Sequence, residues 1–193
     1  MSNPIKILAF AGSAREASFN KKLVQIALEG AKAAGADTTF VDLKDFPMPL
    51  YNGDLEAAQG LPATVKQFKD LLKGHQGFLL SCPEYNGSIT PLLKNAIDWA
   101  SRPEADELSL VCFKGKVAAL LATSPGGLGG LRGLVHVRAI LEGIGTIVIP
   151  DQKAISNAHE AFTELGQLAD SKQMMAVRSI GEKLAEVTTK LNA

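Results

Sequence analysis

Residues 5–20 have the sequence IKILAFAGSAREASFN, and this stretch decides the fold class. It begins with a short apolar run, 5–11, and passes through Gly12 and Ser13. It then enters a segment, 20–34, in which apolar residues recur at helical spacing. The stretch therefore predicts a strand, a tight turn and a helix, which is the first half of a β-α-β unit.

The same alternation of strand and helix continues along the chain. Further strands are predicted at 38–43, 77–82, 116–123 and 146–150. Further helices are predicted at 62–73, 91–101, 134–142 and 159–190, the last one broken near Asp170. Residues 44–61 contain several Pro, Gly and Asn residues and are predicted as a long loop. Strands such as VAALLA at 117–122 are apolar throughout, which is typical of a parallel sheet covered on both faces.

The predicted architecture is an α/β three-layer sandwich with a five-stranded parallel sheet. We predict one domain over residues 1–193 and the strand order 2-1-3-4-5. The alternation alone is equally compatible with a classical Rossmann order. In such sheets ligands bind outside the carboxyl ends of the strands, so the loops after the first, third and fourth strands form the candidate site.

Composition excludes several classes of function. Lys and Arg number 20, as do Asp and Glu, so the net charge is zero and no surplus of cations is left for a nucleic-acid backbone. Cys82 and Cys112 form no C-x-x-C motif, and His75, His136 and His159 are scattered, so no metal centre is predicted. No apolar run is long enough for a membrane span, and the cysteine pattern fits a reducing compartment, so a cytoplasmic location is expected.

The first candidate loop, 12–20, carries four donor side chains at the start of a helix. Ser13 and Ser18 offer hydroxyls, Asn20 offers an amide and Arg15 offers a guanidinium. Because a helix N-terminus attracts anions, the loop is predicted to bind a terminal phosphate. The alternative is that Ser18 or Asn20 only caps the helix. The chain lacks the G-x-x-x-x-G-K-[ST] and G-x-G-x-x-G motifs, which favours a mononucleotide such as FMN.

The second candidate loop follows the third strand and contains Pro83, Glu84, Tyr85, Asn86 and Gly87. Prolines stiffen its backbone, Gly87 permits a close approach, and Tyr85 is suited to pack beside a flat ring. Backbone N–H groups from Tyr85 to Gly87 are expected to donate to polar ring edges. The alternative is a braced turn in which Tyr85 covers the core.

The third candidate loop follows the fourth strand and includes Ser124 and Gly126. Its small residues predict either a wall of the ligand site or a flexible surface loop. Arg132 in this loop contacts either a ligand or a neighbouring subunit.

Arg102, at the end of the helix 91–101, either meets an anionic substrate or caps carbonyl groups. Cys82 has no adjacent His or Lys and is predicted to be a buried structural thiol.

Three motifs in combination resemble the NAD(P)H-dependent FMN reductase family, and within it the bacterial chromate and quinone reductases. They are GS-x-R-x-x-S-x-N at 12–20, PEYNGS at 83–88 and PLLKNAIDWAS at 91–101. The resemblance extends from about residue 5 to the C-terminus. It implies a flavodoxin-like fold and FMN bound without a covalent bond.

The resemblance also implies roles for individual residues. The FMN phosphate is assigned to Ser13, Arg15, Ser18 and Asn20. The isoalloxazine ring and ribityl chain are assigned to Pro83, Glu84, Tyr85, Asn86 and Gly87. The opposite side of the ring is assigned to Ser124 and the glycines from Gly126 onward. Members of the family are usually dimers or tetramers, so a homodimer or homotetramer is expected.

The reaction implied is a ping-pong cycle through bound FMN. NAD(P)H delivers a hydride and leaves, and a quinone, free flavin, chromate or ferric ion then accepts electrons. No catalytic acid or base is predicted, because hydride transfer to a flavin needs none. The alternative is a flavodoxin-type carrier of single electrons that oxidises no nicotinamide. The neutral net charge disfavours it, since such carriers are commonly acidic. The choice between NADH and NADPH, and the physiological acceptor, stay open.

Overall fold

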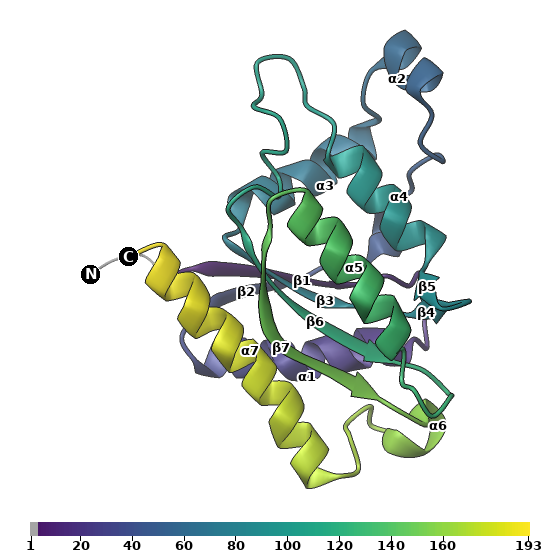
Figure 1. The fold of residues 1–193 in the computed structure, drawn as a ribbon, viewed down its shortest axis with the longest axis vertical. Coiled ribbons are helices and arrows are strands. Elements are labelled where there is room, and N and C mark those ends of the chain that lie inside the picture. The colour runs from purple at the N-terminus through teal and green to yellow at the C-terminus, as the bar shows by residue number, and fades with distance from the viewer. Residues whose placement is uncertain (1–3) are drawn as a thin grey trace.

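The computed structural model describes residues 4–193 and contains a five-stranded parallel sheet (Figure 1). Its spatial order is β2-β1-β3-β6-β7. This confirms the predicted order 2-1-3-4-5, because β4 and β5 form a separate antiparallel hairpin. The strands of the main sheet are β1 (Lys6–Ala11), β2 (Asp37–Phe40), β3 (Gly77–Ser81), β6 (Val117–Thr123) and β7 (Ile147–Ile155).

Helices cover both faces of this sheet (Figure 1). The two on one face are α1 (Phe19–Ala33) and α7 (Ser171–Leu191). Those on the other face are α3 (Ala63–Gly74), α4 (Pro91–Ala100) and α5 (Leu131–Gly143). The three-layer α/β architecture predicted from the sequence is therefore confirmed.

Successive residues of β1 contribute to two separate hydrophobic cores. Ile7 and Ala9 pack in the core that includes α1 and α7. Leu8 and Phe10 pack in the core that includes α3, α4 and α5. All four are at most 3% exposed, because side chains alternate between the two faces of a strand and both faces are covered.

The helices α1 and α7 approach each other closely through two glycines. A Cβ atom at Gly30 would lie 2.0 Å from the carbonyl oxygen of Arg178, and one at Gly181 would lie 1.8 Å from that of Ala27. Any side chain at either position would push the helices apart. This crossing fixes α1, whose N-terminus points to the carboxyl edge of the sheet.

One predicted loop contains two helices. Within residues 44–61 the structure has most of a 3-10 helix, η1 (Leu43–Asp45), and an α-helix, α2 (Gly53–Gln59). Asn52 caps α2, since its Oδ1 accepts a hydrogen bond of 2.8 Å from the N–H of Asp54. The loop prediction is wrong because the prolines and glycines border α2 without interrupting it.

The fifth strand of the sheet is longer than predicted. The prediction ends it at Pro150, whereas β7 continues to Ile155. Its pairing with β6 changes register between Val148 and Gln152. The irregularity accommodates Pro150, which has no N–H to donate to the neighbouring strand.

Two helix boundaries also differ from the prediction. Helix α5 begins at Leu131, within the predicted glycine-rich loop. The predicted helix 159–190 is divided into α6 (Ala158–Ala161) and α7, with residues 162–170 between them. Asp170 lies at the start of the second helix, where its carboxylate caps the N–H groups of Lys172 and Gln173.

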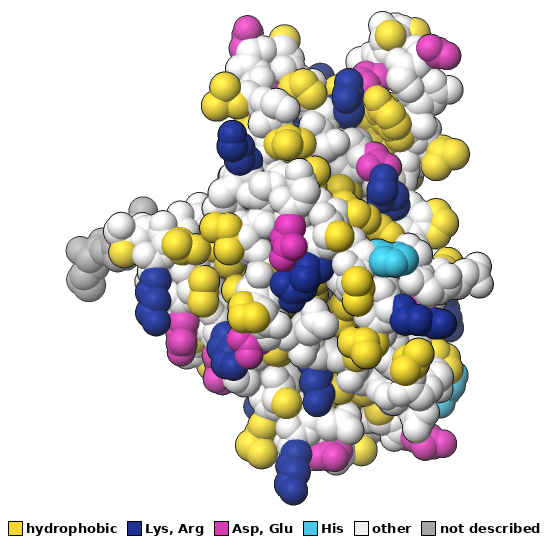
Figure 2. Space-filling model, viewed as in Figure 1, with side chains coloured by type: hydrophobic (Ala, Val, Ile, Leu, Met, Phe, Trp, Pro, Cys, Tyr) yellow, Lys and Arg dark blue, Asp and Glu magenta, His cyan; other side chains and the backbone are white. Residues whose placement is uncertain are grey.

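The surface carries mixed charges. On the face shown in Figure 2, basic and acidic side chains are interspersed. Within residues 4–193, no helix combines the length and apolar character that a membrane crossing requires. In the same range, no three His, Cys, Asp or Glu side chains are grouped so that they could hold a metal ion.

Candidate functional site

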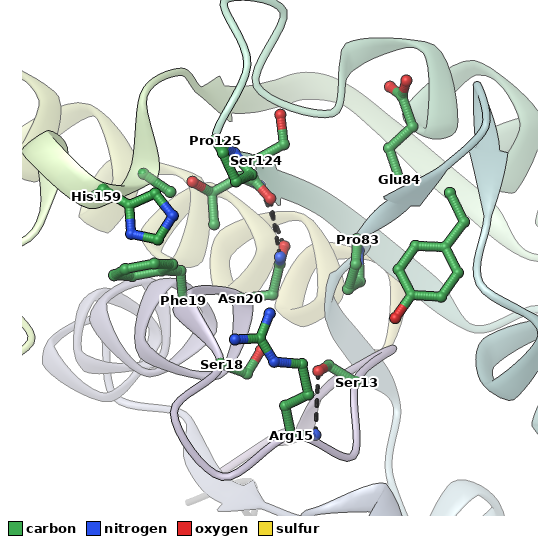
Figure 3. A pocket seen from close by; sticks show the side chains of 13 residues that line it. Ser13, Arg15, Ser18, Phe19, Asn20, Pro83, Glu84, Ser124, Pro125 and His159 are labelled. Carbon is green, nitrogen blue, oxygen red and sulfur yellow. Dashed lines mark hydrogen bonds between the residues drawn. The ribbon is translucent and has the colours of Figure 1, made fainter.

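A cleft of about 170 Å³ opens at the carboxyl ends of β1, β3 and β6 (Figure 3). It brings the three predicted loops together and adds α6 as a further wall. Of the predicted residues, those lining it are Ser13, Arg15, Ser18, Asn20, Pro83, Glu84, Tyr85 and Ser124. The predicted residues outside its lining are Asn86, Gly87 and Gly126. Those that the sequence did not indicate are Phe19, Thr123, Pro125, Ala158 and His159.

The N-terminus of α1 opens into the cleft without a side-chain cap. Ser18 occupies the N-cap position, but its hydroxyl makes no capping hydrogen bond, and the first turn contains no acidic residue. In Figure 3 the Arg15 side chain points from the foot of the cleft toward Asn20. The Oγ of Ser13 accepts a hydrogen bond of 3.3 Å from the N–H of Arg15. Donors and a positive helix end therefore converge on one place, as anion binding requires.

Asn20 ties this end of the cleft to two strands. Its Oδ1 accepts hydrogen bonds from the Oγ of Ser81 at 2.8 Å and from the N–H of Thr123 at 3.1 Å. Its Nδ2 donates to the carbonyl oxygen of Thr123 at 2.9 Å. The side-chain amide is thus bonded mainly to the ends of β3 and β6, and one of its N–H groups is left for a ligand.

The second candidate loop is a hairpin formed by β4 (Glu84–Tyr85) and β5 (Ser88–Ile89). Its two-residue turn, Asn86 and Gly87, has φ angles of 52° and 81°. Asn-Gly is the preferred pair for such a turn, so the sequence did contain a signal for the hairpin. Gly87 therefore serves the turn. Tyr85 is 55% exposed and lines the cleft, so the alternative in which it covers the core is wrong.

Glu84 joins the hairpin to the start of α5. Its carboxylate accepts hydrogen bonds from the N–H of Arg132 at 3.1 Å and from the N–H of Gly133 at 3.3 Å. The guanidinium of Arg132 also donates to it, with Nε at 2.7 Å and Nη2 in contact. Burial by itself would raise the pKa of Glu84, but these hydrogen bonds outweigh burial and lower it. Arg132, whose role the sequence left open, neutralises this carboxylate.

The glycine-rich loop is held against the end of β7. The N–H of Ser124 donates to the carbonyl oxygen of Ile155 at 3.3 Å, and the N–H of Ala158 donates to that of Ser124 at 3.1 Å. The Oγ of Ser156 donates to the carbonyl oxygen of Gly127 at 2.7 Å. These bonds hold the loop against β7 and place α6 at the rim of the cleft.

His159 forms that rim together with Phe19. Their rings are perpendicular, with centroids 5.2 Å apart. In Figure 3 the two stand at the side of the cleft opposite Pro83 and Glu84. The rule that ligands bind at carboxyl ends of strands points to the segment after β7 as well. Because the predicted fifth strand ended at Pro150, the residues after Ile155 were not recognised as part of this edge of the sheet.

Two residues with open roles lie outside the cleft lining. Cys82 is fully buried, and burial raises the pKa of its thiol to about 12, so the prediction of a buried thiol is confirmed. The Nε of Arg102 lies 2.9 Å from both carboxylate oxygens of Glu56 on α2. This pairing is the first cause of the lowered pKa of Glu56.

Comparisons with known proteins bear on the family and fold of the chain. The family model for NADPH-dependent FMN reductases matches residues 5–160. The chain is 37% identical over 173 residues to an NAD(P)H-dependent FMN reductase of Pseudomonas aeruginosa, covering 89% of each. It is 34% identical over 195 residues to an NAD(P)H:quinone oxidoreductase of Solanum tuberosum, covering 97% of this chain and 94% of the relative. A solved flavoenzyme NAD(P)H:(acceptor) oxidoreductase from Paracoccus denitrificans has a TM-score of 0.80 at 30% identity, covering 96% of this chain and 98% of that one.

Proposed function

This chain belongs to the NADPH-dependent FMN reductase family, and on that premise we propose that it uses FMN to pass electrons from NAD(P)H to quinones. One observation carries the proposal. The uncapped N-terminus of α1, with Ser13, Arg15 and Ser18, opens into the same cleft as Pro83 and Tyr85. The cleft thus offers donors for an anion at one end and the side chains of Pro83 and Tyr85 at the other.

The residues at the anion end fit a phosphomonoester. Such a group carries nearly two negative charges and three acceptor oxygens. Arg15 offers a planar cationic donor, and Ser13 and Ser18 offer hydroxyls beside the helix N-terminus. The one acidic side chain among the described lining residues, Glu84, is paired with Arg132 and therefore repels an anion only weakly.

The cleft is too small to enclose a whole flavin. Pockets that bury a drug-sized ligand measure about 300–1,000 Å³. We infer that the phosphate and ribityl chain occupy the 170 Å³ cleft, whereas the ring lies on the hairpin beside Pro83 and Tyr85. We propose that backbone N–H groups near the turn formed by Asn86 and Gly87 donate to polar ring edges. An exposed ring would be open to several acceptors.

FMN, when bound, supplies the redox chemistry by taking a hydride from NAD(P)H and releasing two electrons to an acceptor. Pro83 and Tyr85 would hold the ring, and we propose that nicotinamide and acceptor would use it in turn, which is a ping-pong cycle. We include free flavin, chromate and ferric ion among the proposed acceptors, because this site encloses little of an acceptor. The two free cysteines suit the reducing conditions of a cytoplasm, where we place the reaction.

The test is an anaerobic titration of the yellow holoprotein with NADPH and, separately, NADH. We expect the flavin absorbance to bleach with one equivalent of nicotinamide and to return when benzoquinone is added. A flavodoxin-type carrier would bind FMN but would not be reduced directly by either nicotinamide. A protein that binds no FMN would contradict both functions.

We also propose that the chain assembles as a homodimer or homotetramer. Leu128, Leu131 and Val135 are exposed on α5 and the loop before it. They offer an apolar surface next to the hairpin that Glu84 holds. Analytical ultracentrifugation of the holoprotein should show one species of two or four chains, and a monomer at micromolar concentration would contradict this.

A further inference from the structure

The three histidines differ in how their ring nitrogens are used. His75 contacts the carbonyl oxygen of Leu71 at 2.6 Å and the hydroxyl of Thr39 at 3.1 Å. His136 contacts the hydroxyl of Ser88 at 2.9 Å. Among the described residues, neither ring nitrogen of His159 has a hydrogen-bond partner, and its ring lines the cleft. Of the three histidines, only His159 lines the cleft, and its ring can offer one N–H donor to a ligand there.

The segment that carries His159 is held in place. The Ala158 N–H donates to the carbonyl oxygen of Ser124 at 3.1 Å, and the Asn157 N–H donates to that of Gly126 at 3.4 Å. Asn157 has a φ of 50°, a left-handed conformation that turns the chain from β7 into α6. The backbone thus directs the His159 side chain over the cleft and against Phe19 (Figure 3).

The anion end of the cleft has fewer donors than the motif indicates. Three of the hydrogen bonds that Asn20 can make are used by Ser81 and Thr123. Arg15 is the one Lys or Arg side chain among the described lining residues, whereas a phosphomonoester carries nearly two negative charges. A second side-chain donor would complete the site.

We propose that His159 is this second donor and binds a phosphate oxygen of FMN from the wall opposite the hairpin. This inference rests on the proposed function and makes His159 a specificity residue that favours FMN over riboflavin. The charged groups around it are few. Lys22 lies 5.3 Å from the ring centroid of Phe19, Glu160 follows His159 on α6, and Arg15 faces it across the cleft.

The test compares FMN with riboflavin, which lacks the phosphate. Dissociation constants for both flavins are measured by fluorescence quenching on the full chain after flavin removal. For His159→Ala we expect FMN to bind about tenfold more weakly, as the loss of one hydrogen bond to a charged group predicts. Riboflavin affinity should be unchanged.

Lys22→Ala is the matched control. Lys22 lies close to Phe19 but does not line the cleft, so its loss changes the local charge without removing a phosphate contact. We expect less than a twofold change in FMN affinity for this control, roughly the size of an exposed charge effect. Equal losses for both variants would overturn a direct contact.

Two other outcomes would also overturn the inference. If His159→Ala weakens FMN and riboflavin equally, His159 only packs against the flavin. If it weakens neither, His159 does not touch the flavin. The unmodified protein separates these results from a failure of the proposed function. If it binds FMN and is bleached by NADPH, the proposed function stands whatever the variant does. If it binds no FMN, both proposals fall together.

Discussion

The two ends of the cleft use their polar side chains in opposite ways. At the α1 end, the hydroxyl of Ser18 makes no capping bond, and the guanidinium of Arg15 forms no ion pair within the described residues. At the hairpin end, the carboxylate of Glu84 is bonded to Arg132 and Gly133. The α1 end therefore has donors available for a ligand. At the hairpin end, the charged side chains are paired with each other and hold the hairpin against α5.

This contrast separates two kinds of motif residue. A polar group that the protein leaves without a partner at a cleft can be kept for binding, because it contributes little to the fold. A polar group with several internal partners contributes to stability, because removing it leaves those partners unsatisfied. Substitutions in one short motif should therefore divide into those that weaken FMN binding and those that weaken the fold.

The largest loss of stability is expected for substitution of Asn20, which lies at the α1 end but is hydrogen-bonded to other parts of the protein. Asn20→Ala removes three buried hydrogen bonds and leaves groups of Ser81 and Thr123 unpaired. We expect the free energy of unfolding to fall by about 2–4 kcal/mol. Urea unfolding followed by circular dichroism, in excess FMN and without it, measures this loss.

Asn95→Ala is the control for Asn20. Asn95 also makes side-chain bonds, to the Tyr51 N–H and the Pro49 carbonyl oxygen, but it is less buried and lies outside the cleft lining. Its loss should cost about 1 kcal/mol and leave FMN affinity unchanged. If Asn20→Ala is no more destabilising than this control, the amide of Asn20 acts as a ligand more than as a tether.

Arg15→Ala should have the largest effect on binding alone. The side chain is exposed and has no acidic partner among the described residues, so unfolding should change by less than about 0.5 kcal/mol. FMN affinity should fall about 10- to 100-fold, because charge-assisted bonds to phosphate are lost. Flavin titration measures it, with Arg178→Ala, which removes an exposed arginine paired with Glu29, as the control. Unchanged FMN affinity would contradict the assignment of the FMN phosphate to this loop.

The sequence predicted the sheet better than the loops between its elements. Apolar strands such as Val117–Thr123 are recognisable because a strand buried on both faces has no polar positions. Helix α2 was missed because its signals, the Asn52 cap and a run of helix-forming residues, are local and short. The extension of β7 past Pro150 depends on a register change with β6, and only the assembled sheet determines that.

For the site, sequence predicted which loops meet but not how each side chain is used. Position at the carboxyl edge of the sheet brings Ser13, Pro83 and Ser124 together, and topology alone implies this. Whether Glu84 faces a ligand or pairs with Arg132 depends on where α5 begins, 47 residues later along the chain, counting from Glu84 to Leu131. Such long-range pairing leaves no periodic signal in the sequence.

Glu84→Gln tests the hairpin end and should act mainly on stability. The substitution keeps an acceptor but removes the charge that Arg132 neutralises, so we expect a loss of about 1 kcal/mol at neutral pH. Because the folded pKa of Glu84 is lowered from 4.5, its stabilisation is present above that value and is lost as pH falls through the folded pKa. Chemical unfolding at several pH values should therefore show the two proteins converging in acid. Glu142→Gln, in an exposed pair with Arg138, is the control and should change stability by less than about 0.5 kcal/mol.

The smallest effect on stability is expected at Ser18, and it gives the sharpest comparison. A serine at an N-cap ordinarily contributes about 1 kcal/mol, yet the Ser18 hydroxyl makes no capping bond. Ser18→Ala should therefore leave unfolding nearly unchanged and weaken FMN about fivefold, as loss of one neutral hydrogen bond predicts. Asp170→Ala is its opposite, because Asp170 caps α7 through two bonds and lies outside the cleft lining. That variant should lose about 1 kcal/mol of stability and no FMN affinity. If Ser18→Ala loses as much stability as Asp170→Ala and keeps its FMN affinity, Ser18 caps α1 in solution. The contrast between the α1 end and the hairpin end would then not hold for this residue.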